Sequence, residues 1–380
     1  MKIYYDENMP FAKEFFGDLG QLQPFSGRDV SAEQVKDADV LLVRSITKVN
    51  KALLQQNNNC KFVGTATIGV DHIDQTYLTN RNITFSSAPG CNAISVAEYV
   101  MSALVIMSER YLIDLFSLTV GIVGAGNTGT KLTEKLDALG INYLLCDPLL
   151  VEESDDSRQF STLDDVLKCD VISLHVPITT KGEHATYHLL NEQRLGCLKD
   201  SQILINACRG EVIDNQCLLN LKKQGLKTKI ILDVWENEPN ILIDLIDYTD
   251  IASAHIAGYS LEGKARGTEM LYQALCKTLN IAPEKQLSQF LPSAQIDYIE
   301  IKQDFNEILL NQLVKMVYDV RRDDAIFRQK IDRQQLTAQS FDNIRKTYPA
   351  RREFSAITVA IKNQAQDDVA HRLGFSKTSI

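Results

Sequence analysis

The chain has 380 residues, a hydrophobic share of 44%, a charged share of 23% and a formal net charge of −9. This length predicts two or three domains, and the composition is that of an ordinary globular protein. The negative net charge argues against a nucleic-acid-binding protein, which would present a basic surface to its partner. No apolar run reaches the ~18 residues that cross a membrane.

Eight cysteines are scattered along the chain without a C-x-x-C pair, and some, such as Cys146 and Cys208, lie in apolar runs. This usage favours reduced, buried thiols. Residues 1–6 begin as a strand, without the apolar segment of a signal peptide. We therefore expect a cytoplasmic protein with no metal site, since zinc needs clustered ligands.

The first hundred residues alternate short β-rich runs with polar helical stretches. The runs are residues 2–5, 40–43, 62–65 and 83–86, and the helical stretches surround 12–19 and 51–56. This pattern predicts a small parallel α/β unit, flavodoxin-like in class. Polar residues that include Ser45 and Thr67 follow two strand ends, where open parallel sheets bind ligands. Each of them alone is more often a turn or capping residue.

Residues 94–110 predict a long helix that leads into a second α/β unit at residues 118–257. Six strand-like runs occur there, at 120–123, 143–146, 171–175, 203–206, 230–234 and 251–253. Helical segments separate them, so the unit is predicted to be a doubly wound, Rossmann-type sheet that binds a dinucleotide.

The first strand of this unit runs into the glycines of a G-x-G-x-x-G motif, Gly124, Gly126 and Gly129. The first glycine permits a tight turn, the second lets a pyrophosphate approach, and the third lets helix and strand pack closely. Asn127 and Thr128 lie in the turn, where the helix N-terminus offers N–H groups to phosphate. The alternative is a glycine-rich turn that binds nothing.

Asp147 ends the next apolar run, residues 141–146. A carboxylate there accepts the two ribose hydroxyls of NAD and repels the 2′-phosphate of NADP. Pro148, and not an arginine, follows it. The sequence therefore predicts NAD as the cofactor.

Three residues that suit hydride-transfer chemistry follow later strands, namely Arg209, Glu238 and His255. Histidine titrates near neutrality and can take the hydroxyl proton of a 2-hydroxy acid. A neighbouring carboxylate favours its charged form, and a guanidinium grips a carboxylate with two hydrogen bonds. Each residue alone is more often a surface charge or a cap. His184 and His188, at i and i+4, lack the nearby carboxylate motif expected of a metal pair.

Residues 262–280 predict an amphipathic helix that packs back on the first unit. Beyond residue 286 a strand-like run at 296–301, a long helix at 304–321 and a last strand at 354–361 predict an α+β domain. The basic stretch 345–352 is either a solvated loop or a segment that reaches the substrate. The expected domains are 1–98 with 259–285, 99–258, and 286–380.

The run from Arg44 to Gly267 resembles the NAD-dependent D-2-hydroxyacid dehydrogenases. The motifs that carry the resemblance are Gly64-Thr-Ala-Thr67, Ala88-Pro-Gly-Cys-Asn92, Asn206-Ala-Cys-Arg-Gly210 and the stretch from His255 to Thr268. The resemblance implies NAD-linked oxidation of a phosphorylated 2-hydroxy acid. It also implies a homodimer joined through a C-terminal dimerisation domain.

The resemblance implies a role for each matching residue. His255 is the expected proton donor and acceptor, with Glu238 and Arg209 as its partners. The expected NAD contacts are the Asn127–Thr128 turn, Asp147, Asp233 and Gly258, and the expected substrate contacts are Ser45, Thr67 and Tyr259. Ile68 and Val70, beside Thr67, are larger and less polar than expected of relatives. A dehydrogenase for another 2-hydroxy acid, such as phosphoglycerate, and a dinucleotide-sensing corepressor remain as alternatives.

Overall fold

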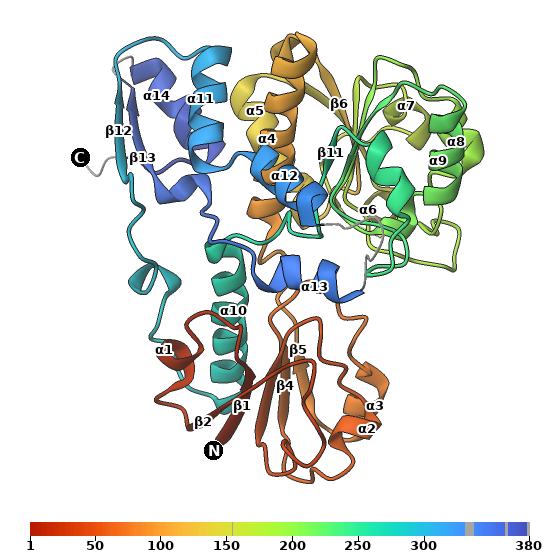
Figure 1. Ribbon diagram of the computed structural model, residues 1–380. Helices are drawn as coiled ribbons and strands as arrows, with labels where there is room; N and C mark the ends of the chain where they lie inside the picture. Colours follow the sequence, from red (N-terminus) through yellow and green to blue (C-terminus); the bar gives the residue numbers. More distant parts are fainter. Residues whose placement is uncertain (154, 331–337, 362–363, 378–380) are drawn as a thin grey trace. The chain divides into compact units, whose positions relative to one another are not determined.

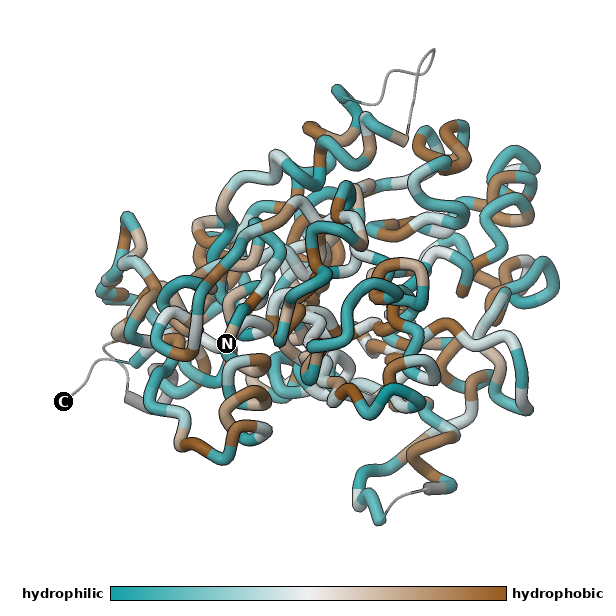
Figure 2. The backbone as a smooth tube through the Cα atoms, turned by 90° about the horizontal axis from the view of Figure 1, so that it is seen from below, coloured by the Kyte–Doolittle hydropathy of each residue, from teal (hydrophilic) through white to brown (hydrophobic). Residues whose placement is uncertain are grey.

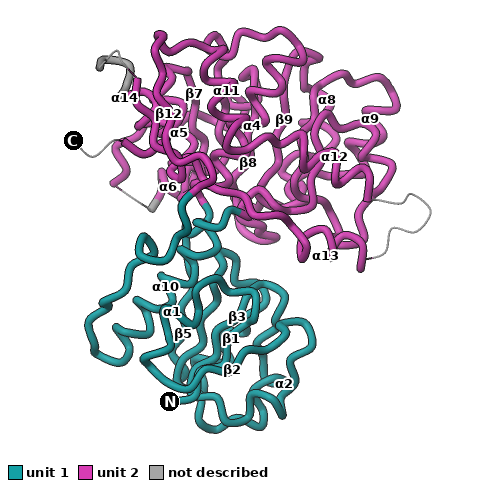
Figure 3. The backbone as a smooth tube through the Cα atoms, turned by 60° about the vertical axis from the view of Figure 1, so that its left-hand side comes forward, with its two compact units in different colours: residues 1–92, 260–293 teal, residues 93–259, 294–380 magenta. Residues whose placement is uncertain are grey.

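The computed structural model describes residues 1–153, 155–330, 338–361 and 364–377. It divides into two compact units (Figure 3). Unit 1 comprises Met1–Asn92 and Ser260–Ser293, and unit 2 comprises Ala93–Tyr259 and Ala294–Ile380. Within the described ranges, no helix combines the length and the apolar character needed to cross a membrane.

Unit 1 is built on a five-stranded parallel sheet in the order β2-β1-β3-β4-β5. The strands are β1 (Lys2–Asp6), β2 (Gln21–Phe25), β3 (Val40–Val43), β4 (Phe62–Thr65) and β5 (Thr84–Ser86). This order is flavodoxin-like, as predicted. The sequence patterns missed β2, because it is polar and contains Pro24. Proline is tolerated there because β2 is an edge strand.

Four helices accompany this sheet, α1 (Ala12–Phe16), α2 (Lys51–Leu54), α3 (Gln75–Asn80) and α10 (Leu261–Leu279), with a 3₁₀ turn η4 (Leu287–Gln289). Helix α10 returns from far along the chain and lies against the sheet (Figure 1). Its Leu271 and Leu275 share a buried core with Phe15 and Phe62. The predicted return of this helix to the first unit is therefore confirmed.

Unit 2 contains a six-stranded parallel sheet in the order β11-β10-β9-β8-β6-β7. The strands are β6 (Thr119–Val123), β7 (Asn142–Cys146), β8 (Val171–Leu174), β9 (Ile203–Asn206), β10 (Lys229–Leu232) and β11 (Ile251–Ala252). The strand order reverses between β6 and β8, which is where doubly wound sheets bind their ligands. All six predicted strands are present, and the predicted fold class is confirmed.

The long helix α4 (Ala93–Tyr111) packs beside α5 (Asn127–Leu139) (Figure 1). The other helices before residue 259 are α6 (Pro148–Glu153), α7 (Leu163–Val166), α8 (Glu192–Gly196) and α9 (Asn215–Lys223), with 3₁₀ turns η1 (Leu115–Ser117), η2 (Gly210–Val212) and η3 (Ile243–Tyr248). Polar and apolar residues alternate along most of the chain (Figure 2), as expected of elements that bury one face.

After residue 294 the chain adds a two-stranded parallel sheet of β12 (Tyr298–Ile301) and β13 (Thr358–Ile361). The helices are α11 (Glu307–Val317), α12 (Val320–Lys330), α13 (Ala338–Lys346) and α14 (Gln364–Leu373), and a 3₁₀ turn η5 (Phe354–Ala356) precedes β13. Most of these elements share the apolar core of α4 and α5, through side chains such as Leu310, Phe354 and Phe375, whereas Phe341 and Ile344 of α13 belong to a second core. The division into three domains stays a prediction.

The prediction of a single helix over 304–321 is wrong. The helix breaks at Tyr318, whose backbone is extended at φ −148° and ψ 112°. Ser102 Oγ donates to the Tyr318 carbonyl at 2.8 Å, and the Tyr318 hydroxyl donates to Asp323 at 2.8 Å. The contact with Ser102, which is 216 residues away, helps to fix the break, so the local apolar pattern could not reveal it.

Candidate active site

The glycine-rich turn joins β6 to α5. Gly124 has φ +95°, and a Cβ there would lie 2.6 Å from the His175 carbonyl oxygen. A Cβ on Gly129 would lie 2.2 Å from the Gly124 carbonyl oxygen. Gly126 differs, because a Cβ there meets no atom within 4 Å. Two of the glycines are thus required by close packing, and the third faces open space in front of the helix.

That open space adjoins the N-terminus of α5. Thr130 N–H donates to the Gly126 carbonyl at 2.9 Å, which begins the helical hydrogen bonding. The N–H groups of the three residues before it, Asn127, Thr128 and Gly129, have no helical carbonyl to receive them. Such N–H groups and the helix dipole favour an anion. The turn therefore fits a pyrophosphate.

Asp147 follows β7 beside the same turn. Its Oδ2 accepts from Ala125 N–H at 2.9 Å, and its Oδ1 accepts from Leu150 N–H at 3.2 Å. The side chain is only partly buried, so the carboxylate is accessible to a ribose. Its position next to the phosphate-binding turn is the one that NAD-binding sheets use.

Arg158 also supports the turn, and sequence reasoning missed it. Its Nη1 donates to the Ala125 carbonyl at 2.9 Å and to Thr130 Oγ1 at 3.0 Å. Asp156 holds the guanidinium through an ion pair. A lone arginine in a polar loop carries no motif, so only the folded chain reveals this contact.

The candidate catalytic residues follow three adjacent strands. Arg209 follows β9, Glu238 follows β10 and His255 follows β11. Because all three strands are parallel, their carboxyl ends lie at one edge of the sheet. Gly210 tightens this edge, since a Cβ there would lie 1.9 Å from the Trp235 carbonyl carbon.

His255 and Glu238 are in direct contact, with Nδ1 and Oε2 2.7 Å apart. The other oxygen, Oε1, accepts from Trp235 N–H at 2.8 Å. Burial alone would raise the pKa of Glu238, but the charge and hydrogen bond of His255, Trp235 N–H and the charge of Arg345 lower it overall. Glu238 therefore stays ionised and orients an imidazole that is 35% exposed.

Asp233 fixes the loop that carries His255. Its Oδ1 accepts from Ser253 Oγ at 2.6 Å and from Ile256 N–H at 2.8 Å, and its Oδ2 accepts from Ala257 N–H at 2.9 Å. Burial raises the pKa of this fully buried carboxyl group. His255 has φ +55°, an uncommon conformation for a residue with a side chain, and these bonds hold it. Gly258 follows directly, and the predicted NAD contacts of both residues stay predictions.

Arg209 lies at the start of η2 and is half-buried. Its Nη1 donates to the Cys208 carbonyl at 2.7 Å, and Asn206 Nδ2 donates to the Arg209 carbonyl at 2.9 Å. The last residue of β9 thus shapes the turn that presents the arginine.

Tyr259, a predicted substrate contact, lies in unit 2. Its ring meets the Tyr348 ring edge to face, with centroids 5.9 Å apart.

The other two predicted substrate contacts, Ser45 and Thr67, lie in unit 1. Ser45 is exposed beyond β3. Thr67 Oγ1 donates to the Gly69 carbonyl at 2.9 Å and lies 2.7 Å from Thr65 Oγ1. Thr65 Oγ1 in turn lies 2.9 Å from His72 Nε2, so His72 adds a titratable group that sequence reasoning missed.

The basic stretch 345–352 is not one solvated loop. Arg351 is buried, and it donates to the Ala257 carbonyl at 2.9 Å and to the Ser95 carbonyl at 2.6 Å. Its guanidinium lies 3.6 Å from the centroid of the Tyr318 ring. Arg351 therefore stabilises the packing of the chain end and is committed to protein groups.

His184 and His188 do not form a metal pair with each other. His184 Nε2 lies 2.7 Å from Glu152, whereas His188 Nε2 lies 2.6 Å from Glu236. His188, Glu236 and Asp214 each bring one potential ligand atom within 4.8 Å. Glu236 also accepts from Asn215 N–H at 3.1 Å. Hydrogen bonds and ion pairing account for this cluster, and we propose no metal there.

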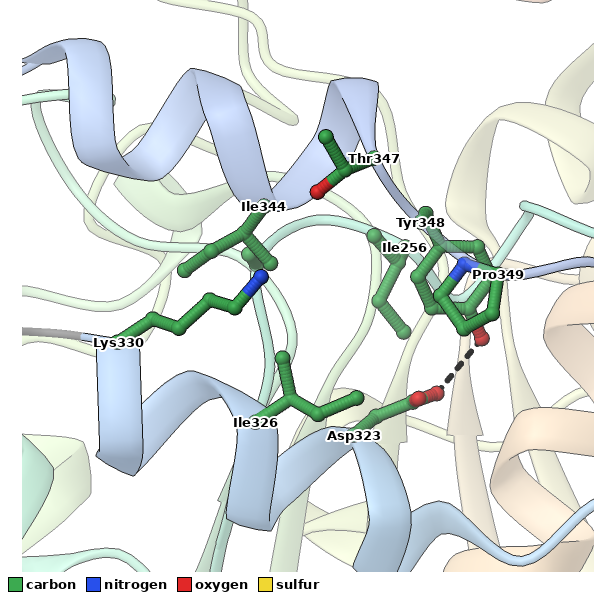
Figure 4. A pocket seen from close by; sticks show the side chains of 9 residues that line it. Ile256, Asp323, Ile326, Lys330, Ile344, Thr347, Tyr348 and Pro349 are labelled. Carbon is green, nitrogen blue, oxygen red and sulfur yellow. Dashed lines mark hydrogen bonds between the residues drawn. The ribbon is translucent and has the colours of Figure 1, made fainter.

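A cavity of about 240 Å³ lies between α12, α13 and the segment around Ile256 (Figure 4). Ile326 and Ile344 make much of its wall apolar, and Lys330 and Asp323 add charge. None of the candidate catalytic residues lines it. Ala254 and Ile256, the two neighbours of His255 in the chain, do line it, so the cavity lies behind the loop that carries His255.

The comparisons with known proteins agree with this arrangement. Residues 97–257 match the family model "D-isomer specific 2-hydroxyacid dehydrogenase, NAD binding domain". Residues 290–374 match a domain of unknown function. The first match confirms NAD as the cofactor that the turn and Asp147 predict.

Curated relatives match essentially the whole chain. The erythronate-4-phosphate dehydrogenase of Colwellia psychrerythraea is 64% identical, over 99% of this chain and 100% of the relative. The erythronate-4-phosphate dehydrogenase of Tolumonas auensis is 51% identical, over 99% of each chain.

Solved structures share the fold over about three quarters of the chain. The D-lactate dehydrogenase of Aquifex aeolicus, complexed with NAD and lactic acid, aligns with a TM-score of 0.58 and 26% identity, over 74% of this chain and 96% of the other. The NAD-bound 3-phosphoglycerate dehydrogenase of Entamoeba histolytica aligns with a TM-score of 0.62 and 22% identity, over 77% of this chain and 99% of the other.

Proposed function

Because the chain belongs to the erythronate-4-phosphate dehydrogenases, within the D-isomer specific 2-hydroxyacid dehydrogenases, we propose that it oxidises 4-phospho-D-erythronate with NAD. The product is (R)-3-hydroxy-2-oxo-4-phosphobutanoate. The observation that carries this proposal is the 64% identity to such a dehydrogenase over 99% of the chain. The contact between His255 and Glu238 at the edge of the NAD-binding sheet supports the same chemistry.

His255 is the proposed proton acceptor. Glu238 occupies Nδ1, so Nε2 is the ring nitrogen that takes the proton of the substrate C2 hydroxyl. The ionised Glu238 stabilises the imidazolium that forms. NAD supplies the hydride acceptor, and the hydrogen on C2 leaves with its electron pair as the carbonyl forms.

Arg209 is the proposed partner of the substrate carboxylate, which its fork of N–H groups can bind with two hydrogen bonds. Ser45, Thr67 and Tyr259 are the proposed substrate contacts. The proposed cofactor contacts are Gly124, Gly126, Asn127, Thr128, Gly129, Asp147, Asp233 and Gly258. Support comes from the packing of the glycines and the hydrogen bonds of both aspartates.

Three further properties belong to this proposal. The reaction would serve the synthesis of pyridoxal 5′-phosphate in the cytoplasm. The enzyme would act as a homodimer joined through residues 286–380. That region is the proposed C-terminal domain, beside an NAD-binding domain at 99–258 and a substrate domain formed by 1–98 and 259–285.

An assay of the purified protein tests the function. With NAD present, NADH formation is measured for 4-phospho-D-erythronate and for 3-phosphoglycerate side by side. We expect a much higher kcat/KM for 4-phospho-D-erythronate. A preference for 3-phosphoglycerate would assign the chain a different substrate, and cofactor binding without turnover of either would support the corepressor alternative.

A further inference from the structure

Helix α13, from the C-terminal region, is anchored beside the loop that carries Glu238. Three aromatic rings in contact, those of Phe341, Phe327 and Trp235, connect the helix to this loop. The Phe341 ring meets the Phe327 ring at 6.2 Å between centroids, and the Phe327 ring stacks on Trp235 at 5.5 Å. Trp235 Nε1 donates to the Ser253 carbonyl at 2.8 Å. All three rings are buried, so the position of α13 relative to the catalytic loops is fixed.

This anchoring places Arg345, in the last turn of α13, at the candidate active site. Its guanidinium carbon lies 5.6 Å from the centroid of the Tyr259 ring. Its charge acts on Glu238, the residue that orients His255. Arg345 Nε is buried and has no hydrogen-bond partner within the part of the chain that the structure describes.

The surroundings keep this guanidinium charged. Burial alone would lower the pKa of Arg345, but Tyr259, Glu238 and Asp342 raise it above its ordinary value. Glu238 already accepts from Trp235 and contacts His255. Its oxygens are therefore committed, and the unpartnered Nε–H remains available to another anion. Leaving a buried donor unpaired is costly, which favours an incoming acceptor.

The substrate brings two anionic groups, a carboxylate and a phosphate. Arg209 is the proposed partner of the carboxylate, so the phosphate needs a second cation. Arginine suits this task, because its planar fork can donate two parallel hydrogen bonds to a phosphate. Arg351 Nε is also unpartnered among the described residues, but this side chain is only 2% exposed, both of its Nη atoms donate to backbone carbonyls, and the Tyr318 ring lies over its guanidinium, so it is closed to a substrate.

We propose that Arg345 binds the phosphate of the substrate and so selects phosphorylated over unphosphorylated 2-hydroxy acids. This inference rests on the proposed function. It gives the C-terminal region a part in substrate selection within its own chain, in addition to its proposed part in dimerisation.

Arg345→Met and Arg345→Lys test the proposal, with Lys346→Met as the matched control. Lys346 is the next residue on α13 and is exposed, so its variant removes a positive charge from the same helix without touching Tyr259. Kinetics are measured with 4-phospho-D-erythronate and with D-erythronate. Thermal denaturation and chain mass in solution verify that each variant is folded and keeps the assembly of the wild type.

We expect Arg345→Met to raise the KM for 4-phospho-D-erythronate by about 10- to 100-fold, the value of a charged hydrogen bond. The ratio of kcat/KM between the two substrates should fall by a similar factor. Arg345→Lys, which keeps the charge but loses the fork, should lie between, and Lys346→Met should match the wild type. An unchanged ratio in both Arg345 variants would overturn the proposal. Equal losses for both substrates with a shifted pH–rate profile would instead make Arg345 a positioning residue for Glu238.

Inorganic phosphate provides a test that does not depend on the substrate assignment. Its binding to the NADH-loaded enzyme is measured by calorimetry for the wild type and Arg345→Met. We expect at least tenfold weaker binding in the variant. Equal affinity would contradict a phosphate site at Arg345. Failure of the wild type to oxidise 4-phospho-D-erythronate would refute the proposed function alone, because the phosphate comparison would still report on Arg345.

Discussion

The two sides of the six-stranded sheet in unit 2 are built differently: β6 and β7 form one side, the cofactor end, and β9, β10 and β11 form the other, the reacting end. At the cofactor end, the turn after β6 and Asp147 after β7 lie close in sequence and contact each other directly. At the reacting end, β9, β10 and β11 each supply one residue, and helices α12 and α13 hold the loops from outside. A contiguous motif thus specifies the first end, whereas the second exists only after distant segments have packed.

The largest expected effect concerns the chemistry of the reacting end. Replacing His255 with Ala removes the proton acceptor, and kcat should fall by about 10²- to 10⁴-fold. NAD affinity should hardly change, because the glycine-rich turn and Asp147 are untouched. Steady-state kinetics and cofactor titration measure the two quantities. Near-normal turnover, under conditions where chemistry limits the rate, would remove His255 from the mechanism.

A matched pair of core variants distinguishes the contribution of packing at the reacting end from that at the cofactor end. Phe327 is fully buried in α12 against Trp235, and Leu132 is fully buried in α5. Phe327→Ala should cost about 3–5 kcal/mol and Leu132→Ala about 2–5 kcal/mol of unfolding free energy, as measured by urea denaturation.

The two variants should differ in activity. In the remaining folded protein, Phe327→Ala should mainly lower kcat, because it loosens the loop of Glu238. Leu132→Ala should mainly weaken NAD binding, because α5 carries the turn. If both variants lower the same parameter, the two ends are not independent.

A smaller effect concerns cofactor choice. Asp147→Ala removes the repulsion of the 2′-phosphate, and the charge of Arg158 acts at the same position. The ratio of kcat/KM for NADP over that for NAD should rise about tenfold, the value of one charged contact. An unchanged ratio would mean that another group discriminates the two cofactors.

A last effect, outside both sites, is a pH dependence of stability. Glu98, in α4, is fully buried, and burial raises its pKa from 4.5 to about 7 despite the charge of Lys135 on α5. Between these values the folded state keeps a proton that the unfolded chain releases. Stability should therefore fall as the pH rises through this window and level off above it. Melting curves at several pH values measure the stability of the wild type and of Glu98→Gln. The wild type should lose stability between pH 4.5 and about 7, whereas the variant should lack this decrease. Parallel pH profiles would contradict it.

Local patterns were sufficient for much of the fold. The β-rich runs in residues 118–257 predicted the six strands of unit 2, and the amphipathic pattern of residues 262–280 predicted the return of α10. These signals are short-range, because each strand or helix must bury its own apolar face. Strand β2 was missed for the same reason, since an edge strand with Pro24 has little to bury.

The sequence indicated candidate site residues where a side chain of suitable chemistry directly follows a predicted strand. Strand ends indicated Arg209, Glu238 and His255, and their neighbouring strands are indeed adjacent. Arg345 lay in the basic stretch 345–352, which the sequence left open as a solvated loop or a segment that reaches the substrate. Arg158 and the loop-holding bonds of Asp233 carried no signal. Their partners lie far along the chain, as with Arg158 and Ala125, which are 33 residues apart. Only packing decides whether such an arginine lies beside Tyr259, as Arg345 does, or within the core, as Arg351 does.

The most direct test of the central claim follows the hydrogen on C2. The enzyme is mixed with NAD and 4-phospho-D-erythronate that carries deuterium at C2, and the reduced cofactor and the solvent are analysed for the label. We expect one deuterium in the nicotinamide ring for each 2-oxo product formed, with wild-type protein and, more slowly, with His255→Ala. Deuterium released to the solvent, or product formed without labelled NADH, would contradict hydride transfer to NAD at this site.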